Sequence, residues 1–290
     1  LVSHRYDLCY CAITCHGTGF LKDAPFVLLC KMFGNKIVIH QHNKGMANDV
    51  DRPVYRWLLP MVYRNAKVVL LSWHLYSDIE KVVPKDNVLI CPNGIKTTVD
   101  PNLKRRSPKV PHVLFLSNLL IDKGVLVLLD ALKILKEQGK GVVCDFVGSE
   151  TKDIDAARFA KEVDKRGLNN IAIFHGCKYG KEKEAYFMQA DIFVLPSFNE
   201  AFPLVNIEAM EYKLPIVSTK VGGIPDEVKN GENGFVIEPR KANELADAIC
   251  KLIDDEKLRR TMGDNSYALF RERFTREHFE DSFIKAMLRA

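Results

Sequence analysis

Two glutamates in a strand–loop–helix context carry the strongest chemical signal of the sequence. Glu200 and Glu208 are separated by seven residues, and they follow the apolar run 192–195. The pattern predicts a buried strand that ends at Leu195, a loop that carries Glu200, and a helix with Pro203 at its first position, which proline suits. A solvated loop residue and an exposed helix residue would show the same spacing by chance, but the switch from strand to helix favours a functional pair.

The expected start of this helix is suited to bind a phosphate. Amides near it, at Phe202 and Leu204, would be free of intrahelical partners, and a helix N-terminus attracts anions through such amides and its dipole. Glu208 falls about one and a half turns into the helix, where a carboxylate can accept hydrogen bonds from a ribose diol. Glu200 would then face a sugar beyond the phosphates. The stretch therefore predicts a site for a nucleoside-diphosphate sugar.

Cations and histidines elsewhere could complete such a site. Lys123 follows a predicted strand, and its flexible ammonium could reach a diphosphate; the alternative is an exposed lysine at a helix start, a poor place for a cation. Alternation along the strand places His40 and His42 on the same side, where they are either structural or directed at a ligand. The residues 16–19 are expected to form a flexible loop.

The elements that must position these residues alternate regularly. In the segment 124–138, apolar residues recur at i, i+3 and i+4, as in an amphipathic helix; further helices are expected at 242–253, 256–270 and 276–288. Short apolar runs predict ten strands: 7–13, 36–40, 67–71, 87–91, 112–116, 142–147, 171–174, 192–195, 215–218 and 234–237. Strands that alternate with helices indicate an α/β fold with parallel sheets.

The order of these elements predicts two domains. Residues 1–95 are expected to form a partial N-terminal Rossmann-like domain, and the polar, proline-bearing stretch 96–110 a linker. Residues 111–272 hold six expected strands, enough for a complete doubly wound sheet, and 273–290 form a helix that could cross back to the first domain. Only four strands are expected before the linker, so we expect an N-terminal truncation.

Composition restricts the class of protein. The chain has 290 residues, 47% of them hydrophobic and 27% charged, with a formal charge of +5; this is typical of a globular protein and gives no support to nucleic acid binding. No apolar run reaches the ~20 residues of a membrane span. The basic runs 104–106 and 178–183 are either solvated faces or attract anionic substrates or a lipid surface.

The eight cysteines argue for a reducing compartment and against a metal. Several interrupt apolar runs, where a reduced cysteine behaves as a small hydrophobe. Cys9, Cys11 and Cys15 with His16 lack the C-x2-C pair of a zinc site. We therefore expect a cytoplasmic protein without a bound metal.

Several motifs resemble one enzyme family. The pair Glu200 and Glu208 looks like the Glu-x7-Glu motif of retaining glycosyltransferases of family 4. The segments 91–95 (Cys-Pro-Asn-Gly-Ile), 115–124, 174–176 and 220–225 are similar to further segments of that family. The resemblance implies the GT-B fold, two Rossmann-like domains that face each other across a cleft. Residues 1–95 would then be the partial acceptor domain, and residues 111–272 the donor-nucleotide-binding domain that mainly holds the donor. One departure is Asn118, where the family commonly has an arginine that neutralises the diphosphate.

The resemblance also implies a set of roles. Transfer would occur with retention of anomeric configuration and without a metal or cofactor, the nucleoside-diphosphate sugar being a substrate. Glu200 and His42 would be catalytic. The donor-binding residues would be Lys123, Asn118, Glu208, Phe202, Pro203, Leu204, Gly176 and Cys177.

The acceptor and the rival functions stay open. The acceptor could be a glycan, a lipid-linked molecule or a small molecule, and polysaccharide biosynthesis and a peripheral contact with the inner face of a membrane are expected by analogy alone. The alternatives are a non-catalytic nucleotide-sugar-binding or partner-binding module and a sugar-nucleotide epimerase. A Rossmann dehydrogenase is disfavoured, because no Gly-x-Gly-x-x-Gly opens an expected helix.

Overall fold

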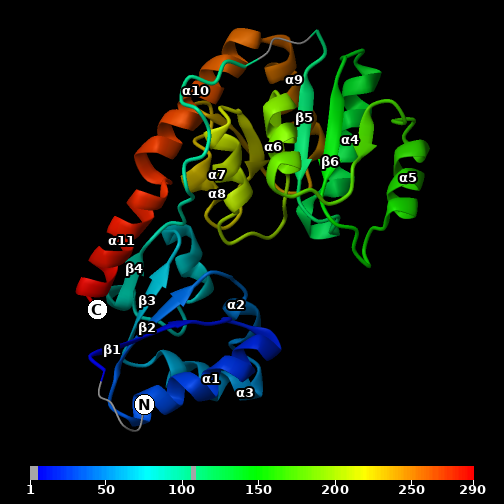
Figure 1. The fold of residues 1–290 in the computed structure, drawn as a ribbon. Coiled ribbons are helices and arrows are strands. Elements are labelled where there is room, and N and C mark those ends of the chain that lie inside the picture. The colour runs from blue at the N-terminus through cyan, green and yellow to red at the C-terminus, as the bar shows by residue number, and fades with distance from the viewer. Residues whose placement is uncertain (1–5, 106–108) are drawn as a thin grey trace. The chain divides into compact units, whose positions relative to one another are not determined.

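The computed structural model describes residues 6–105 and 109–290. It divides into two compact units: unit 1 comprises Leu1–Gly94, Glu200–Phe202 and Arg276–Ala290, and unit 2 comprises Ile95–Asn199 and Pro203–Thr275. Each unit contains one parallel sheet (Figure 1). Part of the expected linker, 106–108, lies outside the described residues, and with it Arg106 of the basic run.

Unit 1 is built on a four-stranded sheet in the order β1-β2-β3-β4. Helix α1 packs against α3 and β2, and α3 against β3. The strands are β1 (Leu8–Ala12), β2 (Lys36–Gln41), β3 (Ala66–Leu70) and β4 (Val88–Ile90), and the helices are α1 (Gly17–Met32), α2 (Met46–Asp49) and α3 (Pro53–Tyr63), with 3-10 turns η1 (Trp73–Asp78) and η2 (Lys85–Asn87).

The prediction of a flexible loop at 16–19 is wrong from Gly17 onward, because the first turn of α1 begins at that residue. The Gly17 amide donates to Asp49 Oδ2 at 2.6 Å, so one of the unpaired amides of the helix start gains a partner. Downstream, Phe20, Ala24 and Val27 are buried at helical spacing, which anchors the helix through its apolar side.

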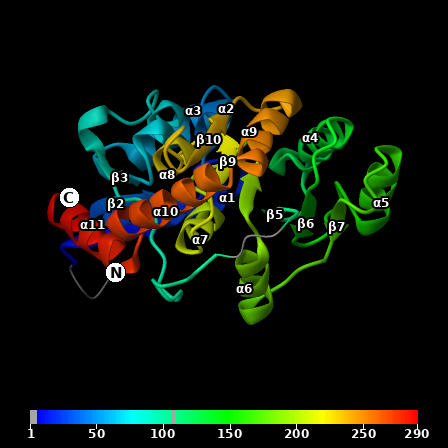
Figure 2. The ribbon, with the colours of Figure 1, turned by 90° about the horizontal axis from the view of Figure 1, so that it is seen from above.

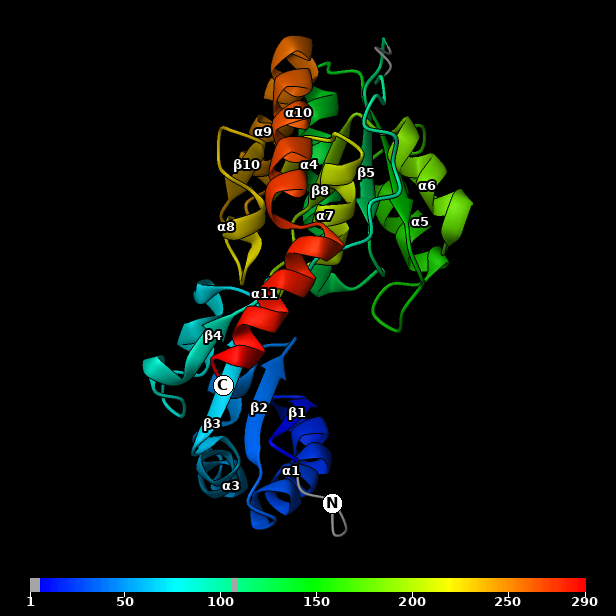
Figure 3. The same cartoon turned by 60° about the vertical axis from the view of Figure 1, so that its left-hand side comes forward.

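The last helix, α11 (Arg276–Leu288), completes the core of unit 1. Its Ala286 is buried with Val38 of β2 and Val69 of β3, and Phe279 and Phe283 pack against the same cluster. Figure 3 shows α11 beside the strands of this unit. The C-terminal segment therefore adds apolar side chains to a sheet that lies far away in the sequence.

Unit 2 is built on a six-stranded parallel sheet in the order β10-β9-β8-β5-β6-β7. Strand order reverses between β5 and β8, which makes their carboxyl ends the switch point where doubly wound sheets bind ligands. The strands are β5 (His112–Leu116), β6 (Val143–Val147), β7 (Ala172–Phe174), β8 (Ile192–Leu195), β9 (Ile216–Thr219) and β10 (Gly234–Ile237). All ten expected strands are present, and the predicted α/β class is confirmed.

Helices cover both faces of this sheet, so its strands are buried runs such as β8, all four residues of which are inaccessible. Figure 2 shows α4, α5 and α9 on one side and α6 and α7 on the other. The helices are α4 (Val125–Glu137), α5 (Ala156–Lys165), α6 (Gly180–Gln189), α7 (Leu204–Glu211), α8 (Ile224–Glu227), α9 (Ala242–Asp254) and α10 (Glu256–Arg273), with a 3-10 turn η3 (Ile121–Lys123).

The described part of the expected linker is fastened to unit 2. Glu211, at the end of α7, is 2% exposed. Its carboxylate accepts hydrogen bonds from the backbone amides of Thr98 and Val99, the latter at 2.8 Å. Further along, the Arg105 guanidinium donates to the Phe187 carbonyl at 3.1 Å. Within the described residues, no helix combines the length and apolar character that a membrane crossing requires.

Candidate functional site

The loops that follow β5 and β8 are locked together at the switch point. The Phe198 amide donates to the Asp122 carbonyl at 2.7 Å. Gly124 has a φ of +78°, and a Cβ there would lie 2.1 Å from the Pro196 carbonyl oxygen. Only glycine allows both this backbone conformation and this approach. The loop that leads toward Glu200 is thus fixed against the turn that carries Lys123.

Lys123 is half-buried at the end of η3, directly before Gly124, which caps α4. After β5 the chain makes one 3-10 turn and enters α4 through the left-handed Gly124. Lys123 therefore lies at the carboxyl edge of the sheet, beside the loop after β8, where a diphosphate would require a cation.

The loops after β5, β6 and β7 meet around Gly148 and Ser149. A Cβ on Gly148 would lie 1.9 Å from the Ser117 carbonyl oxygen, so the two loops touch through their backbones. The Ser149 amide donates to Asn118 Oδ1 at 3.3 Å, and the Gly148 amide donates to the Gly176 carbonyl at 3.0 Å. Because the Asn118 oxygen accepts within the protein, its NH2 group is the part that can serve a ligand.

Cys177 lies exposed beside this junction. A hydrogen bond with the Ser149 side chain, and a second with that of Tyr179, hold the pKa of its thiol below the ordinary value. The structure thus brings together Asn118, Gly176 and Cys177, three of the predicted donor-binding residues. Ser149 connects them, although only its place after a predicted strand could have drawn attention to it.

Helix α7 begins one residue later than predicted. Pro203 has extended backbone angles and is the N-cap, and Leu204 is the first helical residue. The Pro203 carbonyl accepts from the Asn206 amide at 3.0 Å, as an N-cap carbonyl accepts the first bonds of a helix. Of the two residues on either side of Pro203, the side chain of Phe202 is buried and that of Leu204 is exposed to solvent.

Glu208 forms an ion pair that sequence reasoning missed. Its Oε1 lies 2.8 Å from Lys183 Nζ of α6, and both side chains are about a quarter exposed, at 27% and 28%. The carboxylate expected to hold a ribose therefore already has a cationic partner. The two residues lie 25 positions apart in the sequence, so no local pattern could have shown this pair.

A buried hydrogen bond joins α7 to α8. Asn206 Nδ2 donates to Glu227 Oε2 of α8 at 2.6 Å, and both residues are fully buried. Glu227 follows the segment 220–225 that resembles the family. Since burial strengthens such a bond and makes its loss costly, this contact fixes the start of α7 relative to α8.

The other predicted residues, His42 and Glu200, belong to unit 1. His40 is fully buried, and its Nδ1 lies 2.8 Å from the Tyr10 hydroxyl. Burial, with the nearby His42, lowers the pKa of His40 to about 3. The His42 ring lies 4.1 Å from the His40 ring, as alternation predicted, and burial also lowers the pKa of His42. Glu200 falls in the short stretch Glu200–Phe202 that groups with unit 1.

Comparison with known proteins decides the family. The model of the family described as glycosyl transferases group 1 matches residues 99–269. The chain belongs to this family. The matched range covers most of unit 2, including the loops that carry Lys123, Gly176 and Glu208.

Relatives of this group 1 protein include named transferases. It is 30% identical over 161 residues to the capsular polysaccharide biosynthesis glycosyltransferase CapM of Staphylococcus aureus, covering 56% of this chain and 41% of CapM. It is 25% identical over 281 residues to the alpha-D-kanosaminyltransferase of Streptomyces kanamyceticus, covering 88% of this chain and 70% of that transferase. The chain spans about half the length of most of the curated relatives it matches.

Solved structures confirm the predicted GT-B fold class. Anabaena HepE in complex with UDP matches with a TM-score of 0.83 at 22% identity, over 98% of this chain and 79% of HepE. Sucrose-phosphate synthase from Thermosynechococcus elongatus matches with a TM-score of 0.79 at 23% identity, over 98% of this chain and 73% of the synthase. At these identities the likeness extends to the fold alone.

Proposed function

We propose that this group 1 protein transfers a sugar from a nucleoside-diphosphate sugar to an acceptor with retention of configuration, as a family 4 enzyme. The observation that carries the proposal is the junction of strand-end loops in unit 2, where Lys123, Asn118, Gly176 and the start of α7 lie along the carboxyl edge of one sheet. The relative HepE was solved with UDP, which supports a nucleotide ligand and makes UDP the first probe.

In this proposal the leaving diphosphate is stabilised by fixed groups. Lys123 supplies the charge, the Asn118 NH2 group supplies hydrogen bonds, and the amides at the start of α7 add their dipoles where negative charge develops. The backbone-locked loops hold these groups in place before the reaction, so little reorganisation is needed. This charge handling requires neither a metal nor a cofactor.

The nucleoside would be held at two points. Backbone groups at Gly176 and Cys177 would contact the base, and Glu208 would accept from the ribose hydroxyls. Glu208 has two oxygens and accepts from Lys183 through Oε1, so ribose binding through Oε2 would retain the ion pair. Lys183 is then a positioning residue that orients the carboxylate.

The transferred sugar would be handled by Glu200 and His42. Glu200 would orient its hydroxyls. His42, whose pKa is lowered by burial, would be neutral near pH 7 and act as a hydrogen-bonding group. Attack would occur on the face that the leaving group departs from, with the departing phosphate oxygen taking the proton of the acceptor. The name of CapM supports an acceptor in polysaccharide biosynthesis, and a lipid-linked acceptor at the inner face of a membrane belongs to the same proposal.

The test is the product and its dependence on Glu200. Incubation with UDP-sugars and candidate acceptors should give a glycoside whose anomeric configuration, read by NMR, equals that of the donor. Glu200→Ala should abolish transfer yet leave UDP affinity within about twofold, whereas Glu232→Ala, at an exposed position of unit 2, should change neither. An inverted product would refute retention, and parallel loss of transfer and UDP affinity would refute the role of Glu200.

A non-catalytic nucleotide-sugar-binding module is the second candidate, favoured by Asn118 at the position of the usual arginine. Such a module would bind UDP but show no hydrolysis or transfer of any donor. Measurable slow hydrolysis of a UDP-sugar without acceptor, lost in Glu200→Ala, would exclude it. Formation of an epimerised sugar nucleotide in the same assay would instead support the epimerase.

A further inference from the structure

A cationic cavity lies at the opposite edge of the unit 2 sheet from the proposed donor site. It has a volume of about 300 Å³ and is lined by Leu103, Lys104, Arg105, Asp191, Lys213, Pro215, Arg259, Arg260 and Asp264. Asp191 and Pro215 directly precede β8 and β9, so the cavity borders the amino ends of these strands. Four residues at ~3.3 Å each separate it from the carboxyl edge by about 13 Å.

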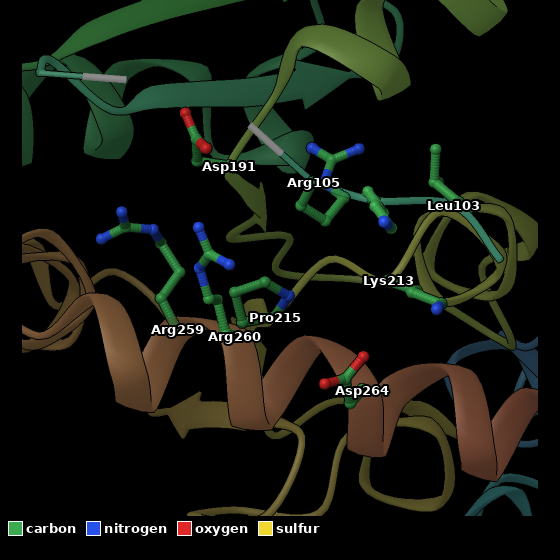
Figure 4. A pocket seen from close by; sticks show the side chains of 9 residues that line it. Leu103, Arg105, Asp191, Lys213, Pro215, Arg259, Arg260 and Asp264 are labelled. Carbon is green, nitrogen blue, oxygen red and sulfur yellow. The ribbon is translucent and has the colours of Figure 1, made fainter. Parts of the chain in front are cut away.

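The charge of the lining is strongly positive. Five cationic side chains face two carboxylates, and Figure 4 shows Arg259, Arg260 and Asp264 rising from one helix toward Arg105 and Asp191. One further carboxylate, Glu256, lies 2.8 Å from Arg260, which still leaves an excess of two positive charges. Cations this close repel one another unless an anion lies between them.

Two of the guanidinium groups are held in place by backbone carbonyls. Arg259 is 6% exposed and donates through one terminal nitrogen to the Leu252 carbonyl at 2.6 Å. Arg105 donates through one terminal nitrogen to Phe187, and burial lowers its pKa to about 10, against the attraction of Asp191. A guanidinium has five N–H donors in a rigid fork, so each group retains donors with the geometry to bind a phosphate.

Asp191 is the buried carboxylate of this cavity. It is 7% exposed and accepts the His112 amide at 2.8 Å. Burial raises the pKa of this carboxyl, while the His112 amide and the charges of Arg259 and Arg105 oppose the rise. The cavity therefore combines a buried carboxylate with two arginines that backbone carbonyls hold in place, and Lys104, Lys213 and Arg260 also line it.

We propose that this cavity binds a small phosphorylated molecule, with its phosphoryl group among Arg105, Arg259 and Arg260 and its hydroxyl groups toward Asp264. The volume is at the small end of ligand sites, which suits a phosphorylated sugar or polyol. Because Leu103, Lys104 and Arg105 belong to the segment that connects the strands β4 and β5, an occupant also holds that segment to unit 2.

The first test is calorimetry with sodium pyrophosphate in the presence and absence of saturating UDP. We expect a pyrophosphate site that persists with UDP and in Lys123→Ala. Arg105→Gln/Arg260→Gln should lower its affinity at least about tenfold, since two charge-assisted hydrogen-bonding groups are removed. The matched double change Lys161→Gln/Lys165→Gln, at exposed positions of α5, should leave it unchanged.

Limited trypsin digestion tests the same claim without any variant. Pyrophosphate should slow cleavage after Lys104 and Arg105 severalfold, while cleavage after Lys161 continues at its original rate. Equal affinity of the two double variants for pyrophosphate, or equal protection of all three bonds, would overturn the proposal. A third result would also overturn it: the unaltered protein does not bind pyrophosphate but floats with phosphatidylglycerol vesicles, and Arg105→Gln/Arg260→Gln abolishes the flotation. The phosphoryl group would then belong to a lipid.

Discussion

Replacing Gly124 with alanine tests whether the contact between the β5 and β8 loops builds the donor site. The new Cβ would lie 2.1 Å from the Pro196 carbonyl oxygen, whereas real Cβ atoms essentially never approach a heavy atom within 3.0 Å. The loops must therefore separate by roughly 1 Å. The left-handed backbone costs an alanine about 1–2 kcal/mol, and the overlap adds about 1–3 kcal/mol. We expect an unfolding free energy lower by about 2–5 kcal/mol.

The matched control is Gly139→Ala, which follows the other end of α4. Gly139 has a φ of +72°, close to that of Gly124, but nothing lies within 4 Å of its Cβ position. It should show only the backbone cost, and it should bind UDP like the unaltered protein. Gly124→Ala should in addition lose about 100-fold in transfer rate, the effect expected of a misplacement near 1 Å. Urea unfolding and transfer assays that rank the two variants equally would refute the reasoning.

Three further results are expected. Glu211→Gln should lower the unfolding free energy by about 1.5–3 kcal/mol in urea, because a buried carboxylate that accepts two linker amides is lost; an unchanged midpoint would contradict this. For His40, the folded pKa of about 3 lies below the unfolded 6.5, so the unfolded state binds more protons and stability should fall as pH falls from 6.5 toward 3, by up to about 1.4 kcal/mol per pH unit. His40→Asn should remove that part of the slope, and equal slopes would contradict the assignment. Cys177 should react fastest with iodoacetamide among the cysteines, since it is exposed and Ser149 lowers its pKa, and UDP should slow the reaction; labelling indifferent to UDP would place the base elsewhere.

The sequence was sufficient for the strands and for the edge of the sheet where the site residues lie. Buried parallel strands such as β8 are continuous apolar runs, which can be recognised without any knowledge of their neighbours. The same holds for α4, whose apolar side chains recur at helical spacing. Residues that follow strand ends, such as Lys123 and Gly176, could then be assigned to one edge, because parallel strands end together.

The remainder depends on contacts between distant segments. The ion pair of Glu208 with Lys183 joins two helices, and the role of Ser149 follows from three loops that converge, so neither leaves a local pattern. The start of α1 at Gly17 depends on Asp49, which lies 32 residues away. Pro203 was misplaced by one residue because proline is compatible with both the N-cap and the first helical position. The N-terminal truncation, the roles of Glu200 and His42, and retention stay predictions.

The most direct test of the central claim is isothermal titration of UDP into the protein in buffer without divalent metal. We predict binding at one site per chain. Glu208→Gln should weaken it about 10- to 100-fold, the loss expected when a hydrogen bond to a charged group is removed. Glu182→Gln, an exposed change on α6, should bind like the unaltered protein. Absence of UDP binding in the folded protein, or equal affinity of the two variants, would contradict the proposed donor site.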